Sequence, residues 1–309
     1  MQFRFHTFSE LETILHAEKI PAPEYGIKRE AFMSGMSEAQ ILAEIDRRIA
    51  VTRKALIKGL ENPQHSRSGL TKGAAVAFAS SSRHLIRDDL FTRSLAYALA
   101  INEVNACGGK VVSFPTAGSC GIVLGVIWVW WDTRENQARE GAIGTVCPRD
   151  SPDEKYDSRL RDAFLVASLT GVIIAQGATL AGSEGGCQAE CGAAGAMAAC
   201  ALAYLEEQSL KACFSAAALS LKNFLGLVCD PVAGLVEVPW VKRNAFVAAN
   251  ALTVVDLTLS SIESIIPFDE MVWAMKQIGD NLPGSIKENS TGGLAITPTG
   301  LAFKQALER

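Results

Sequence analysis

Two short segments place a cysteine where thiolate chemistry is favoured. In the first, Gly185-Gly186 precedes Cys187 at a predicted helix start, and the partial positive charge of a helix start stabilises a thiolate. In the second, Cys229 follows an apolar run and precedes Asp230-Pro231, which predicts a position at a helix end. Thiolates that converge from loops and helix ends are ligands of iron–sulfur clusters, so the two segments predict a metal site.

The other cysteines have a simpler interpretation. A free cysteine usually behaves as a small buried apolar side chain. The sequence favours that interpretation for Cys107, Cys147, Cys200 and Cys213. Eight cysteines in 309 residues do not suggest a disulfide framework, which is typical of small secreted domains.

Glycine-rich segments with hydroxyl side chains are the second chemical signal. Residues 114–121 (FPTAGSCG) and 290–293 (STGG) combine exposed amides with hydroxyls, a combination that can hold a carboxylate or phosphate through backbone N–H groups. Arg67, Lys242 and Arg243 stand in polar segments and offer cations for a carboxylate. Ordinary turns and a solvated helix start are the alternatives for these segments.

Several classes of protein are disfavoured by what the sequence lacks. The four histidines form neither His-x-x-x-His nor His-Glu-x-x-His, so a zinc hydrolase is not expected. The serine-hydrolase elbow Gly-x-Ser-x-Gly and the dinucleotide fingerprint are also missing. The net charge of −4 gives no strong field for nucleic acid or anionic membranes. The first residues lack the apolar run of a signal peptide, and we expect a reducing, cytoplasmic setting.

The elements that must position these residues are predicted to be helices. Ser37 and Gln40 form a capping box before a helix over 38–60, and Asp88 or Asp89 caps a helix that runs to Ala106. The uncharged stretches 111–131 and 163–183 are long enough to span a membrane. Their many small and polar residues favour buried helices instead.

Alternating strand patterns are scarce, so the expected fold class is all-α. We predict an amphipathic helical N-terminal lobe over residues 1–62 and a helical catalytic domain over 63–309. Residues 145–158 are expected to form a polar linker, and 289–300 a turn-rich loop. Further helices are predicted over 159–181, 188–206, 209–225, 241–262 and 267–279.

Six segments in matching order carry a resemblance to a known family, the α chain of the iron–sulfur-dependent L-serine dehydratases, or L-serine ammonia-lyases. The resemblance covers most of the chain after residue 66. The matching segments are 66–71, 115–121, 184–190, 229–237, 242–244, and 290–295 with 297–300.

The resemblance implies a mostly helical catalytic domain and a β-chain partner. It also implies a [4Fe–4S] cluster, held by three cysteines, whose open iron acts as a Lewis acid in the β-elimination of L-serine to pyruvate and ammonia. Cys187 and Cys229 match two cluster ligands. The substrate-binding residues that it implies are Ser68, Thr116, Ser119, Asn244 and Thr291.

The third cluster position departs from the family pattern, because Trp240 stands there and an indole cannot ligate iron. Three outcomes remain open from the sequence. Cys191, four residues after Cys187, or Cys120 can replace the missing ligand. Two thiolates and another donor can hold a labile cluster. Alternatively the cluster is absent, and the chain acts on another substrate or as a non-catalytic subunit.

Overall fold

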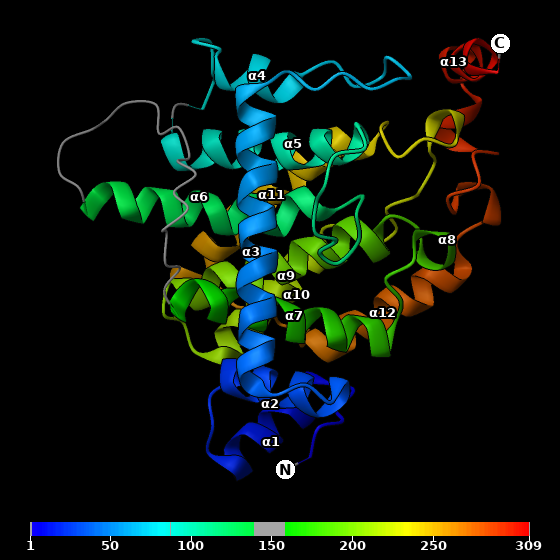
Figure 1. Ribbon diagram of the computed structural model, residues 1–309. Coiled ribbons are helices and arrows are strands. Elements are labelled where there is room, and N and C mark those ends of the chain that lie inside the picture. The colour runs from blue at the N-terminus through cyan, green and yellow to red at the C-terminus, as the bar shows by residue number, and fades with distance from the viewer. Residues whose placement is uncertain (1, 87, 139–157, 309) are drawn as a thin grey trace.

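The structure is a computed structural model that describes residues 2–86, 88–138 and 158–308. Its regular elements within those residues are helices, which confirms the all-α prediction (Figure 1). The predicted linker over 145–158 lies outside the described residues except for Ser158. The main helices are α1 (Phe8–Glu18), α2 (Ala22–Ser34), α3 (Glu38–Glu61), α4 (Ala74–Ala79), α5 (Asp89–Ala106), α6 (Cys120–Ala138), α7 (Ser158–Gly177), α8 (Gly182–Gly185), α9 (Ala193–Leu205), α10 (Leu210–Lys222), α11 (Trp240–Leu259), α12 (Phe268–Asn281) and α13 (Pro298–Leu307).

Local capping explains where the best-predicted helices begin. The Ser37 hydroxyl accepts from the Gln40 amide N–H, and the Gln40 side chain accepts from the Ser37 amide N–H, which is a complete capping box for α3. Asp88 caps α5 by accepting from the Phe91 amide at 2.7 Å. Both starts agree with the sequence-based prediction.

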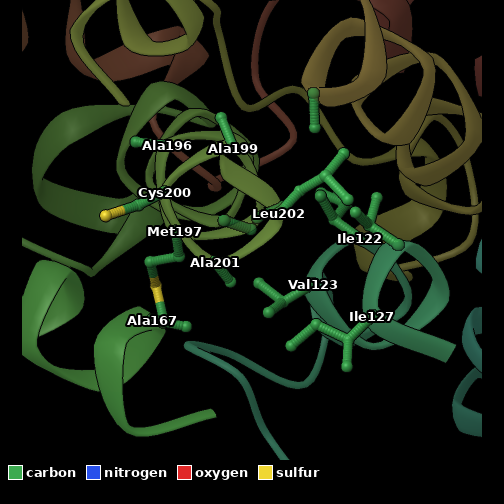
Figure 2. Packing of buried hydrophobic residues seen from close by; sticks show 14 of the residues in the cluster. Ile122, Val123, Ile127, Ala167, Ala196, Met197, Ala199, Cys200, Ala201 and Leu202 are labelled. Atoms are coloured by element: carbon green, nitrogen blue, oxygen red, sulfur yellow. The ribbon is translucent and has the colours of Figure 1, made fainter. Parts of the chain in front are cut away.

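Helix α9 lies at the centre of the bundle and is built from small side chains. It packs against α6, α7, α10 and α11, and nearly all of its residues are buried. Figure 2 shows Met197 of α9 pointing toward Ala167 of α7, and Ala201 and Leu202 of α9 on the side of Ile122 and Val123 of α6. Because small side chains let helix backbones approach closely, four helices can pack directly against α9.

Helix α3 stands across the bundle, from α1 and α2 at one end to α4 at the other (Figure 1). Its Arg53 forms a two-pronged ion pair with Asp132 of α6, at 2.8 and 2.9 Å, and the Tyr97 hydroxyl of α5 donates to the same carboxylate. The Arg53 guanidinium also lies 4.5 Å above the ring of Trp128. The predicted division at residue 62 stays a prediction.

The two uncharged stretches have different structures. Only the second half of 111–131 is helical, because α6 begins at Cys120, so a helix over the whole stretch was wrong. The α6 residues from Cys120 to Asp132 are buried. Among the described residues, α7 alone is long and apolar enough to cross a membrane, and 61% of its most apolar window is buried inside the protein. That burial agrees with the prediction of a core helix.

Other boundaries also need correction. The predicted helix over 188–206 begins with a π-helical turn, η1 (Gln188–Gly192), before α9. The predicted loop over 289–300 is wrong at its end, since the Thr297 hydroxyl caps α13 by accepting from the Gly300 amide. Cys229 does not lie at a helix end: α10 stops at Lys222, and Cys229 lies in an extended segment paired with residues 286–288.

Candidate functional site

Two segments far apart in the chain bring the cysteines together. Cys187 precedes η1 directly, at a helix start as predicted. The Cys229 amide donates to the Ile286 carbonyl at 2.9 Å, and the Glu288 amide donates to the Cys229 carbonyl at 2.7 Å. The buried Gln188 side chain joins the two regions, because it accepts from the Gly226 amide just before the Cys229 segment. The site is thus fixed by backbone pairing as well as by side chains.

The thiols of Cys187 and Cys191 lie 3.3 Å apart, and both side chains are fully buried. Hydrogen bonds from Cys191 and then Cys229 hold the pKa of Cys187 well below its usual range. The same contacts raise the pKa of Cys191 and of Cys229. The structure therefore favours one thiolate, at Cys187, between two neighbouring thiols. Cys120 is not part of this group: its buried thiol lies against Asn102.

Two carboxylates lie beside these thiols. Glu190 Oε2 is 3.8 Å from Cys229 Sγ, and the ligand atoms of Glu190, Cys229 and Glu288 all lie within 4.8 Å of one another. Burial, followed by the charges of Cys187 and Glu288, raises the pKa of Glu190 to about 7. Burial and Cys187 also raise the pKa of Glu288. The site gathers negative groups away from water.

Trp240 packs directly against Glu190. Its indole is fully buried, and its Nε1 donates to Glu190 Oε2 at 3.3 Å. The ring also packs on the loop before α6: a Cβ on Gly118 would lie 3.1 Å from Trp240 Cδ1. The indole therefore fills the space between Glu190 and this loop.

The predicted substrate-binding residues do not all lie together. Thr116 hydrogen-bonds to Glu190, and its hydroxyl is 2.9 Å from that of Ser119. Asn244 donates to the Gly118 and Trp240 carbonyls, both at 2.9 Å, so it fixes the loop of Thr116 and Ser119. Its own Oδ1 is buried without a hydrogen-bond partner among the described residues.

Ser68 and Thr291 have other partners. The Ser68 hydroxyl donates to the buried carboxylate of Glu237 at 2.5 Å. Thr291 is exposed, and its hydroxyl donates to Asn289 at 2.7 Å. A role in substrate binding stays a prediction for both.

Sequence reasoning missed three contributors to the site. Glu190 lies inside the first cysteine motif, which is the signal that could have drawn attention to it. Arg243, which the sequence offered as a cation for a carboxylate, donates to the Val228 carbonyl and pairs with Asp230 on either side of Cys229. Glu288 and Gly182 have no local signal, because only the fold brings them to Cys229.

Comparison with known proteins gives the same family as the motifs. A sequence model described as serine dehydratase alpha chain matches residues 11–295. The chain belongs to this family. It is 38% identical over 306 residues to the probable L-serine dehydratase alpha chain of Bacillus subtilis (strain 168), covering 98% of this chain and 95% of that one. It is 34% identical over 306 residues to the L-serine dehydratase alpha chain of Peptoniphilus asaccharolyticus, with 97% of each chain covered.

A third relative is longer than this serine dehydratase α chain. L-serine dehydratase 1 of Escherichia coli (strain K12) is 36% identical over 203 residues, which are 65% of this chain and 40% of that protein. The α-type sequence thus also occurs as part of a larger protein.

The residues present do not fit a cluster held by three cysteines in the family arrangement. The third ligand position that the resemblance implies falls on Trp240, and its indole is buried. Cys191 lies beside Cys187, with their sulfurs 3.3 Å apart and on the same helical turn. Two thiols so near each other are placed to bind the same metal atom. In a cubane cluster, by contrast, each cysteine binds a different iron. Cys191 therefore lies where it would bind the same metal atom as Cys187, and its role as the third cluster ligand stays a prediction.

Proposed function

We propose that this chain is the catalytic α subunit of an L-serine ammonia-lyase, which forms pyruvate and ammonia from L-serine by β-elimination. Membership of the serine dehydratase α-chain family over residues 11–295 supports the reaction class. The observation that carries the proposal is the convergence of Cys187, Cys229 and the Thr116 loop around the buried Glu190. A chain that had lost all chemistry would have no need of this costly buried polar site.

The reaction removes the α proton and the β hydroxide of serine, and the aminoacrylate then tautomerises and hydrolyses. Thr116 and Ser119 precede the first turn of α6, where free amide groups favour an anion. We assign this loop to the carboxylate of serine. Asn244 acts through Gly118 to hold the loop in place. Hydroxide is a poor leaving group, so an electrophile is needed beside Glu190 and the cysteines.

The metal centre and the partner are part of the same proposal. A [4Fe–4S] cluster on Cys187, Cys191 and Cys229 is the sequence-based prediction, and iron and acid-labile sulfide content decide it. Because the relatives of matching length are named alpha chains, we propose a β-chain partner and an oligomeric, cytoplasmic enzyme.

A second candidate function rests on Trp240. If its indole has displaced the metal centre, the chain is a cluster-free homologue that acts on another substrate or stabilises a partner subunit. A colourless, metal-free protein that still binds a β chain and forms no pyruvate would favour this candidate.

The test is a pyruvate assay on chain purified without oxygen together with any β chain that accompanies it. Thr116→Val removes the hydroxyl while keeping the shape, and loss of one hydrogen bond to a charged group should lower kcat/KM for L-serine about 10- to 100-fold. Thr253→Val is the matched control, because Thr253 is exposed on α11 and bonds only to its own helix. Equal kcat/KM for Thr116→Val and Thr253→Val would contradict the assigned role of the loop.

A further inference from the structure

The ligand atoms of Cys229, Glu190 and Glu288 converge on one point of the structure. They come from three segments and all lie within 4.8 Å of one another. Gly182 leaves the point open: a Cβ there would lie 2.6 Å from Glu190 Oε2, 3.0 Å from Glu288 Oε2 and 3.1 Å from Cys229 Sγ. A side chain at residue 182 would fill the centre that the three donors surround.

The separation of Cys229 and Glu190 suits a single ion. Metal bonds of about 2.3 Å to sulfur and about 2.0 Å to oxygen place neighbouring tetrahedral ligands roughly 3.3 to 3.8 Å apart. Cys229 Sγ and Glu190 Oε2 are 3.8 Å apart already. One thiolate with two carboxylates is a donor set for zinc or ferrous iron rather than for magnesium or calcium, which prefer oxygen alone.

The charges at the site also favour the binding of a cation. Glu190 and Cys229 are buried and Glu288 is half-buried. Arg243 is the neighbouring cation, but it pairs with Asp230 at 3.5 Å and donates to the Val228 carbonyl at 2.9 Å. Two carboxylates this close together are stabilised by a cation between them, and a divalent ion supplies it.

We propose that this chain binds one divalent transition-metal ion, zinc or ferrous iron, between Cys229, Glu190 and Glu288. Three protein ligands leave a coordination position open, which is typical of catalytic rather than structural sites. The ion takes the place that the buried Trp240 denies to a three-cysteine cluster. The inference rests on the proposed function for its role, because the ion would be the electrophile that the elimination of hydroxide requires.

Cobalt(II) is the probe for the test. Chain stripped by a chelator under argon is titrated with Co²⁺, and binding is followed by thiolate-to-cobalt charge-transfer absorption. The expected result is one Co²⁺ per chain, loss of the charge-transfer band in Cys229→Ser, and affinity at least about tenfold weaker in Glu288→Gln. Gly182→Ala keeps every ligand and should also weaken binding, because its methyl group occupies the centre.

Glu184→Gln is the matched control, since Glu184 is an exposed carboxylate on the adjacent turn α8. Circular dichroism shows whether each variant is folded. If Glu288→Gln does not fold, the Co²⁺ affinity of Gly182→Ala decides the test. Wild-type chain that binds no Co²⁺, or Glu288→Gln and Gly182→Ala that both bind as tightly as Glu184→Gln, would overturn the proposal.

Metal content of the purified protein separates this inference from the proposed function. One zinc or iron per chain without acid-labile sulfide supports the mononuclear site, even if L-serine yields no pyruvate. About four iron and four sulfide with pyruvate formed would uphold the lyase and overturn the mononuclear site.

Discussion

In the metal-free protein, the free energy of unfolding depends on pH through Glu190, and the size of this dependence follows from the raised pKa of the carboxyl group. Its pKa rises from an ordinary 4.5 to about 7, chiefly by burial and then by the charges of Cys187 and Glu288. At 1.36 kcal/mol for each pH unit, that difference corresponds to about 3 kcal/mol. The folded chain holds this proton more tightly than the unfolded chain does. The stabilising contribution is therefore fully present below pH 4.5 and is lost as the pH rises through about 7.

The perturbation is Glu190→Gln, which keeps the shape and removes the titration. Urea unfolding of reduced, chelator-treated protein is measured at pH 5 and pH 8. We expect the wild-type free energy of unfolding to fall by about 2.5 kcal/mol more than that of Glu190→Gln between these pH values, because part of the contribution is already lost at pH 5. Glu184→Gln, with its exposed side chain, should behave as wild type does. The same pH dependence in wild type and Glu190→Gln would refute the reasoning.

Three further predictions concern packing and the third ligand position. Asp132→Leu should cost about 3 to 5 kcal/mol of stability because it removes the carboxylate that forms the buried ion pair with Arg53, and adding Arg53→Met should restore most of it; urea unfolding of both proteins checks this, and an equal loss in both would count against it. Gly121→Ala should lower the free energy of unfolding by about 1 to 3 kcal/mol, because its Cβ would collide with the Ala98 carbonyl; unchanged stability would show that α5 and α6 can separate. Trp240→Cys should raise the iron and sulfide bound after anaerobic reconstitution, and unchanged iron would show that residue 240 does not control cluster binding.

Local sequence signals predicted much of the fold. Ser37 and Asp88 predicted the starts of α3 and α5, since a cap depends only on residues within one turn. The spacing of Cys187 and Cys191 predicted that their thiols meet, although the helix there is π-helical. The start of α6 was not predictable in this way. Two asparagines from other helices hold the Gly118 carbonyl, and this contact between distant residues fixes the loop before Cys120.

The residues of the candidate site also differ in whether a local sequence motif marks them. Cys187, Cys229 and Thr116 carry local motifs, and the structure brings all three to Glu190. Glu288 reaches the site only because its backbone pairs with that of Cys229, 59 positions earlier in the sequence. No periodicity or capping pattern records such a pairing, so a search for cysteine motifs could not find this carboxylate.

The formation of pyruvate from L-serine tests the central claim most directly. The chain is purified without oxygen with its accompanying β chain, its metal content is recorded, and pyruvate and ammonia are measured on the same sample. The account predicts equal amounts of pyruvate and ammonia, with the rate lowered in Thr116→Val and unchanged in Thr253→Val. A metal-loaded, partner-bound sample that leaves L-serine intact would contradict it.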